Sequence, residues 1–157
     1  MIRLIAAIDQ QRGIAKNGRQ PWSIPNDERY FRDQTVKFGA RILMGRKTFD
    51  VISHPLANRT NYVLSHTHIE YPGVSGVIDL ATFLQEASED IWVIGGAAIY
   101  EQTIALADFL YLTLIEADFG CDQFFPTYGE QFELADQSPP QHEAGLTYRY
   151  TIYRRRR

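Results

Sequence analysis

An acidic side chain and an aromatic ring lie one helical turn apart in the first third of the chain. Trp22 stands between two prolines, and the helical pattern that follows places Asp27 and Phe31 four residues apart. Residues with this spacing share one face of a helix, so a carboxylate would lie beside an aromatic wall. This pair suits a flat heterocycle that forms hydrogen bonds. Ordinary capping is the alternative for Asp27 and Glu28, because acidic residues complement the dipole at a helix start.

A second candidate site is an apolar run that ends in two glycines. Residues 91–94 predict a buried strand, and Gly95 and Gly96 lead directly into a helical pattern. Free amide groups and the positive end of the helix dipole favour a pyrophosphate there, and glycine lets the backbone approach it closely. A tight turn without a ligand is an equal alternative, because the full Rossmann spacing of glycines is missing.

A similar junction occurs earlier, where a strand-like run over residues 42–44 is followed by Gly45, Arg46, Lys47 and Thr48. Cations at a helix start oppose the helix dipole, so a phosphate explains Arg46 and Lys47 better than helix stability does. A phosphate beyond the pyrophosphate would indicate NADP rather than NAD. Two surface cations without a ligand are the alternative.

An α/β framework is expected to position these residues. Short apolar, β-branched runs predict strands over residues 2–8, 41–44, 61–64, 74–78, 91–94 and 109–115. Helical spacing predicts helices over residues 26–35, 47–52, 80–87 and 97–106. Strands that alternate with helices indicate a single α/β domain, with a mostly parallel, twisted central sheet of about eight strands flanked by helices.

The end of the chain has a different pattern. Residues 132–135 and 147–153 are strand-like and have a Ser-Pro-Pro loop rather than a helix between them. They predict an antiparallel C-terminal hairpin. The last four residues, Arg154 to Arg157, are interpreted as a solvated tail of the single domain spanning residues 1–157.

Composition narrows the classes of protein. The 157 residues are 45% hydrophobic and 22% charged, as in one globular domain. The net charge of -3 provides no excess of positive charge to neutralise the phosphates of a nucleic acid. The apolar start over residues 1–8 is too short for a signal segment or a membrane span. A single cysteine, Cys121, forms neither an internal disulfide nor a multi-cysteine metal site. We therefore expect a cytoplasmic monomer without a metal, a nucleic-acid partner or a membrane partner.

Taken in order, these motifs resemble dihydrofolate reductase of the bacterial type over nearly the whole chain. The matching segments are Leu4 to Ile8, Pro21-Trp22 with Asp27 and Phe31, Met44 to Phe49, Ile94-Gly95-Gly96 with Tyr100, Leu110 to Thr113, and Phe125-Pro126. The resemblance implies NADPH-dependent reduction of 7,8-dihydrofolate to 5,6,7,8-tetrahydrofolate. Hydride would pass from C4 of the nicotinamide to C6 of the pterin, with protonation at N5.

The resemblance also implies the roles of individual residues. Asp27 would hydrogen-bond the 2-amino group and N3 of the pterin, supported by Thr113 and by a water associated with Trp22, so these three are the catalytic candidates. Arg59 would clamp the α-carboxylate of the glutamate tail, which suits a planar guanidinium. The other substrate-binding candidates are Ile5, Ala6, Glu28, Phe31, Ile52, Ile94 and Tyr100.

On the cofactor side, the resemblance places NADPH against both glycine junctions and the strand end between them. The candidates are Ala7, Ile14, Gly45, Arg46, Lys47, Thr48, Leu64, Ser65, His66, Ile94, Gly95, Gly96, Ala97, Ala98 and Tyr100. Arg46, Ser65 and His66 would face the 2′-phosphate. For the isoleucines on both sides, packing in an ordinary core is an equal alternative.

Several positions depart from the family pattern. Ala15 and Gln20 alter the loop that would form a lid, and Glu28 adds a second carboxylate beside the acid. Two alternative functions therefore stay open. One is another pteridine or riboflavin-pathway reductase on the same fold, and the other is a non-catalytic NADP-binding protein.

Overall fold

A computed structural model describes all residues of the chain, 1–157. Its strands are β1 (Ile2–Ile8), β2 (Gly13–Ala15), β3 (Arg41–Gly45), β4 (Thr60–Leu64), β5 (Val74–Val77), β6 (Ile91–Gly95), β7 (Phe109–Ile115), β8 (Gln123–Phe124), β9 (Phe132–Gln137), β10 (Gln141–Glu143) and β11 (Leu146–Arg155). Its helices are α1 (Pro25–Thr35), α2 (Arg46–Ile52), α3 (Leu80–Glu86) and α4 (Ala97–Thr103), with a short 3₁₀ turn at Ile104–Leu106. Every helix and long strand predicted from the sequence is present.

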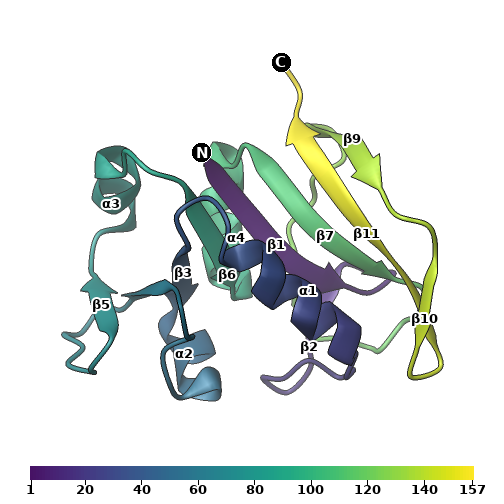
Figure 1. Cartoon of the computed structure of the whole chain (residues 1–157), viewed down its shortest axis with the longest axis horizontal. Coiled ribbons are helices and arrows are strands. Elements are labelled where there is room, and N and C mark those ends of the chain that lie inside the picture. The colour runs from purple at the N-terminus through teal and green to yellow at the C-terminus, as the bar shows by residue number, and fades with distance from the viewer.

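One nine-stranded sheet forms the centre of the molecule, in the order β10-β11-β7-β1-β6-β3-β4-β5, with β9 also paired to β11 (Figure 1). The six strands from β7 to β5 in this order run parallel. Helical crossovers between parallel strands account for this arrangement, because parallel neighbours cannot be joined by a tight turn. The predicted mostly parallel α/β sheet is confirmed.

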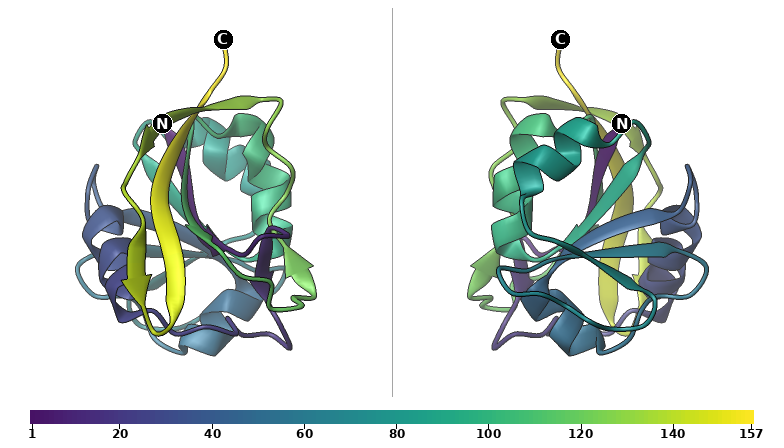
Figure 2. Two further views of the ribbon diagram at one scale, coloured as in Figure 1. Left: turned by 90° about the vertical axis from the view of Figure 1, so that its right-hand side faces the viewer. Right: turned by 90° about the vertical axis from the view of Figure 1, so that its left-hand side faces the viewer.

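Alternating side chains of the sheet pack into two apolar clusters, one on each face. Leu4 and Leu110 pack with Ile99 of α4 on one face, whereas Ile5 and Tyr111 pack toward α1 and α2 on the other. Figure 2 shows the helices on both sides of the sheet. A strand covered on both faces reads as a continuous apolar run, which explains the composition of β1. None of the helices has the length and apolar character needed to cross a membrane.

The C-terminal strands add the antiparallel part of the sheet. Strand β11 pairs antiparallel with β7, β9 and β10, so the predicted C-terminal hairpin is confirmed. Strand β11 continues to Arg155, and the predicted solvated tail is wrong for this half-buried residue, whereas Arg154 is exposed. The Arg155 guanidinium donates to the carbonyl oxygens of Ala107 (2.7 Å) and Ile104 (2.6 Å), and Arg154 pairs with Glu133 (3.0 Å).

A second, two-stranded sheet was not predicted. Strands β2 and β8 pair antiparallel and join the loop after β1 to the segment before Phe125. Three and two residues are too few to show an alternating pattern in the sequence. This small sheet fixes the loop that leads to Trp22.

Candidate active site

The predicted site residues gather where the parallel strands end. Strand pairing sets Ala7 beside Thr113, and it places Gly45 beside Leu64 on one side with Met44 beside Gly95 on the other. The carboxyl ends of parallel strands share one edge of the sheet, which is where open α/β sheets bind ligands.

Helix α1 carries Asp27 to this edge. Its first residue is Pro25, which is suited to a helix start because it has no N–H to leave unpaired. Asp27 lies in the first turn, and the buried Thr113 hydroxyl of β7 donates to Asp27 Oδ1 over 2.6 Å. The sheet and the helix thus hold one carboxylate in a fixed position.

The pKa of Asp27 is raised to about 6. Burial is the largest cause, the hydrogen bond from Thr113 opposes it, and the negative charge of Glu28 raises the pKa further. An acid that titrates near neutral pH can favour protonation of a bound group or accept a proton from it. Glu28 itself is exposed to solvent.

Trp22 belongs to the same apolar cluster as Ala7, one of the cofactor candidates. Its side chain is buried, and its ring centroid lies 5.2 Å from that of Phe119. The Nε1 atom of Trp22 is buried without a hydrogen-bond partner in the protein. Buried N–H groups normally have a protein or water partner, so this donor is available to a water or a ligand group.

Four residues predicted to line the substrate pocket belong to one apolar cluster. Ile5, Phe31, Ile52 and Ile94 pack together, with Phe31 from α1 and Ile52 from α2 facing the two strands. Ala6 is not part of this wall, because its side chain points to the opposite face of the sheet and packs against the cluster beside α4.

Arg59 lies at the open end of this apolar wall. It donates to Thr35 Oγ1 (2.9 Å) and to the Ala57 carbonyl (3.0 Å), and its guanidinium carbon lies 6.0 Å from the centre of the Phe31 ring. Burial lowers the pKa of Arg59, and the positive charge of Arg32 lowers it further. Two cations therefore lie at this end of the wall. Arg32 was not predicted, although its place directly after Phe31 was a possible signal.

The two glycine junctions face each other across β3 and β6. Gly45 and Gly96 are the N-cap residues of α2 and α4, and neither helix start has a side-chain cap. A Cβ on Gly96 would lie 3.3 Å from Thr48 Oγ1, so the glycine allows a close approach between Thr48 and the backbone at this helix start. Gly95 and Gly96 are joined by a cis peptide bond. Two neighbouring helix starts without side-chain caps fit a phosphate of a dinucleotide.

The other cofactor candidates differ in burial and in their hydrogen-bond partners. The Tyr100 hydroxyl is buried and donates to the Ile5 carbonyl over 2.6 Å. Arg46 is exposed and pairs with Asp50 (Nε to Oδ1, 3.1 Å), and Ser65 is buried. Of the remaining candidates, Ala7 is buried, Ile14, Thr48, Leu64 and Ala97 are half-buried, and Lys47, His66 and Ala98 are exposed. Arg46 and Lys47 are exposed cations next to Gly45, and they fit a dinucleotide with an additional phosphate.

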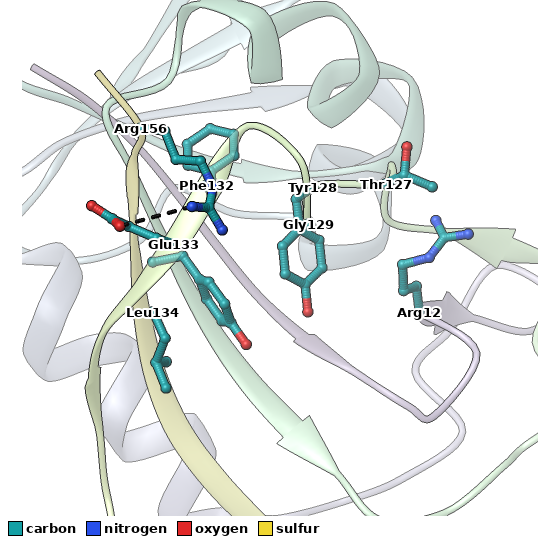
Figure 3. A pocket seen from close by; sticks show the side chains of 9 residues that line it. Arg12, Thr127, Tyr128, Gly129, Phe132, Glu133, Leu134 and Arg156 are labelled. Atoms are coloured by element: carbon teal, nitrogen blue, oxygen red, sulfur yellow. Dashed lines mark ion pairs between the residues drawn. The ribbon is translucent and has the colours of Figure 1, made fainter.

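A hollow of about 410 Å³ lies outside this site (Figure 3). It is lined by Arg12, Thr127, Tyr128, Gly129, Phe132, Glu133, Leu134, Tyr153 and Arg156. None of the predicted site residues is among them, and the Arg156 guanidinium approaches Glu133 at 4.0 Å. The candidate active site is therefore the strand edge and not this hollow.

Asp9 is a second carboxylate at this edge of the sheet, and its side chain is buried. Burial raises the pKa of Asp9, but hydrogen bonds from the N–H groups of Phe119, Gly13 and Gln11 outweigh burial and leave this pKa below its ordinary value. Two of these donors are local and one is 110 residues away. No sequence pattern indicates such a set of donors.

Comparison with known proteins gives one consistent result. The family model for dihydrofolate reductase matches residues 1–157. The chain is 36% identical to a dihydrofolate reductase of Bacillus subtilis (strain 168), covering 99% of this chain and 95% of the relative. It is 37% identical to that of Haemophilus influenzae, covering 83% and 82%. A dihydrofolate reductase structure from Enterococcus faecalis, complexed with NADP(H) and RAB-propyl, has a TM-score of 0.87 and 28% identity, covering 99% and 96%. The chain belongs to the dihydrofolate reductase family.

Proposed function

We propose that the protein reduces 7,8-dihydrofolate to 5,6,7,8-tetrahydrofolate with NADPH. The observation that carries this proposal is Asp27, an acid with a pKa of about 6 that is hydrogen-bonded to Thr113 beside an apolar wall. A carboxyl group in this setting pairs with the amino and ring-nitrogen donors of a pterin. The family match and the NADP(H) held by a relative support the same reaction.

In this proposal, Asp27 binds the pterin and controls the proton, whereas the apolar residues bind the ring. Asp27 orients the pterin through its 2-amino group and N3, and it favours protonation at N5. Ile5, Phe31 and Ile52 form an apolar wall that excludes water from the reacting ring. NADPH, when bound, supplies the hydride to C6 of the pterin. Trp22 Nε1 has no hydrogen-bond partner in the protein, so it would donate to a water molecule between Trp22 and the pterin.

Arg59 and Arg32 favour folate over other pteridine substrates. Arg59 and Arg32 place positive charge at the open end of the wall, where the glutamate tail of folate carries two carboxylates. A planar guanidinium binds a carboxylate through two parallel hydrogen bonds. A pteridine or riboflavin-pathway substrate without this tail gives such a pair of cations no carboxylate to bind.

The cofactor would be held by residues of the two glycine junctions. Gly45 and Gly96 begin two helices without side-chain caps, and these helix starts, with Gly95 and Thr48, would offer amide and hydroxyl groups to the pyrophosphate. Arg46, Ser65 and His66 lie at the neighbouring strand ends and would bind the 2′-phosphate. Phosphate recognition by these residues predicts a preference for NADPH over NADH.

The test is an absorbance assay of NADPH oxidation with purified protein and dihydrofolate. We expect oxidation with NADPH and much slower oxidation with NADH. If the folded protein binds NADPH but does not oxidise it, the non-catalytic binding protein is the correct alternative. If it accepts a riboflavin-pathway substrate instead of dihydrofolate, the assignment to folate is wrong.

We also propose that the protein works as a monomer in the cytoplasm and binds neither nucleic acid nor membranes. The net charge of -3 and the single cysteine support this proposal. Light scattering coupled to size exclusion should give the mass of one chain, 18.0 kDa. A mass of twice that value would contradict the monomer.

A further inference from the structure

Asp9 joins two loops that are far apart in the sequence. The residue directly follows β1, and its side chain is buried. Asp9 Oδ1 accepts hydrogen bonds from the N–H groups of Gln11 (2.9 Å) and Gly13 (2.7 Å) in the loop that leads to Trp22. Asp9 Oδ2 accepts from the N–H of Phe119 (3.1 Å) and the thiol of Cys121 (3.5 Å). Each oxygen therefore serves one loop.

Both loops lead to residues of the candidate site. Gly13 begins β2, whose next residue is Ile14, a predicted cofactor contact. Phe119 packs its ring against Trp22 with 5.2 Å between centroids. A change at Asp9 would reach the proposed cofactor site through Ile14 and the catalytic candidate Trp22 through Phe119.

The two loops are closely packed beside Asp9 at Gly13. A Cβ on Gly13 would lie 2.5 Å from Cys121 Cβ, 2.7 Å from Cys121 Sγ and 2.8 Å from Asp9 Oδ1. A second backbone contact between the loops, from the Gln10 N–H to the Ala117 carbonyl (2.9 Å), lies beside it. Close-packed contacts of this kind transmit a displacement and do not absorb it.

We infer that Asp9 is a positioning residue for the proposed reduction. Its carboxylate fastens residues 10–20 to residues 116–121 and so holds Ile14 and Trp22 in place at the site. This inference rests on the proposed function. It concerns a residue that touches neither substrate nor cofactor and that acts through the two loops.

The first test is Asp9→Asn, which preserves size but replaces one acceptor oxygen with an NH₂ group. The amide oxygen can still serve Gln11 and Gly13, whereas the NH₂ group would face the N–H of Phe119. The hydrogen bond between Asp9 and the N–H of Phe119 should break, while the local turn and the Gln10–Ala117 backbone contact should remain. We expect kcat/KM to fall by about tenfold, as for the loss of a hydrogen bond to a charged group.

Asp118→Asn is the matched control. Asp118 is an exposed carboxylate of the same loop that accepts only from the N–H of Gly120, at 2.9 Å. Its substitution removes the same charge without breaking the link between the loops. We expect wild-type kcat and KM for Asp118→Asn, and an equal loss in both variants would overturn the inference.

Two further readouts separate positioning from general stability. Hydrogen exchange at the Phe119 amide should become faster by about tenfold in Asp9→Asn, while exchange at Leu112 in β7 stays protected. The pH profile of the rate should keep its apparent pKa, because Asp27 sets it. A shifted pKa would mean that the Asp9 charge acts directly on Asp27, and faster Phe119 exchange with unchanged kcat and KM would mean that the link has no role in the reaction.

Gly13→Ala provides a second variant, should Asp9→Asn fail to fold. It separates the same loops by steric contact while Asp9 keeps its charge. We expect it to reproduce both the faster Phe119 exchange and the lower kcat/KM, and wild-type kinetics in this variant would contradict the inference. Exchange is measured without substrate, so a wild-type protein with no turnover would refute the proposed function separately from the link between the loops.

Discussion

Asp27 and Asp9 lie at the same edge of the sheet but meet different donors. Asp27 accepts from one hydroxyl, whereas Asp9 accepts from three backbone N–H groups and a thiol. Burial raises the pKa of both carboxyl groups, and only the larger donor set reverses this effect. Asp9 is therefore held as an anion, and Asp27 is left able to titrate near neutral pH.

The raised pKa of Asp27 has a consequence for stability. A carboxyl group whose pKa is higher in the folded state favours folding below its unfolded pKa, and this contribution is lost as pH rises through the folded pKa. With a pKa near 6 instead of 3.8, charged Asp27 should cost about 3 kcal/mol above pH 6.

Asp27→Asn should therefore raise the free energy of unfolding by about 2 to 3 kcal/mol at neutral pH. Asn keeps an oxygen that accepts from Thr113, so the hydrogen bond remains. Urea unfolding of both proteins should show the difference growing between about pH 4 and about pH 6. A difference that does not vary with pH would show that Asp27 is not buried as a charge.

The sequence predicted the residues of the site best where they share one helix. Asp27 and Phe31 are four residues apart, and their spacing alone indicated one face. Thr113 lies 86 residues from Asp27, so it followed from the resemblance and not from spacing. Arg32 and Asp9 were missed because their significance depends on partners that only the fold brings close.

At the scale of elements, the two strand–glycine–helix junctions form one unit. Gly45 ends β3 and Gly96 directly follows β6, the parallel neighbour of β3, and Thr48 Oγ1 lies close to Gly96. Neither junction alone distinguishes a tight turn from a phosphate site. Their pairing across the sheet creates a cradle with two uncapped helix starts.

Gly96→Ala should weaken NADPH binding by about tenfold, which corresponds to roughly 1.4 kcal/mol. The added methyl group would lie 3.3 Å from Thr48 Oγ1, so it would displace Thr48 and keep the proposed pyrophosphate away from the backbone. The quenching of intrinsic fluorescence by NADPH measures the dissociation constant. Gly129→Ala is the control, because its Cβ would meet nothing within 4 Å. Unchanged NADPH affinity in Gly96→Ala would place the pyrophosphate elsewhere.

The elements themselves were predicted well from the sequence because most are long and strongly apolar. Strands β1 and β7 agree with their predicted ranges at both ends. The short strands β2, β8 and β10 were missed because two or three residues carry no periodic pattern. The predicted helix over residues 97–106 changes into a 3₁₀ turn after Thr103.

At the scale of the whole molecule, the end of β11 connects the antiparallel strands to the parallel core. The Arg155 guanidinium lies 4.7 Å from the centre of the Phe132 ring and donates to the carbonyls of Ile104 and Ala107. Cations near the end of a helix satisfy carbonyl groups that would otherwise lack partners. The sequence could not distinguish Arg155 from the other three arginines, because only the fold places Ile104 and Ala107 beside it.

Arg155→Gln should lower the free energy of unfolding by about 2 kcal/mol, because it removes two hydrogen bonds from a charged donor at a half-buried site. Urea unfolding measures this change. Arg157→Gln alters an exposed arginine of the same run and should change stability by less than about 0.5 kcal/mol. Equal effects of the two substitutions would mean that Arg155 is solvated like the end of the chain.

We propose that Asp27 controls the proton in the NADPH-dependent reduction of dihydrofolate. Stopped-flow oxidation of bound NADPH, measured from about pH 5 to about pH 9 in wild type and Asp27→Asn, tests this role of Asp27. The wild-type rate should fall as pH rises through about 6, where Asp27 loses its proton. The Asp27→Asn rate should be lower by orders of magnitude near neutral pH and recover partly in acid, where solvent supplies the proton. Equal rates in the two proteins across this range would remove Asp27 from the mechanism.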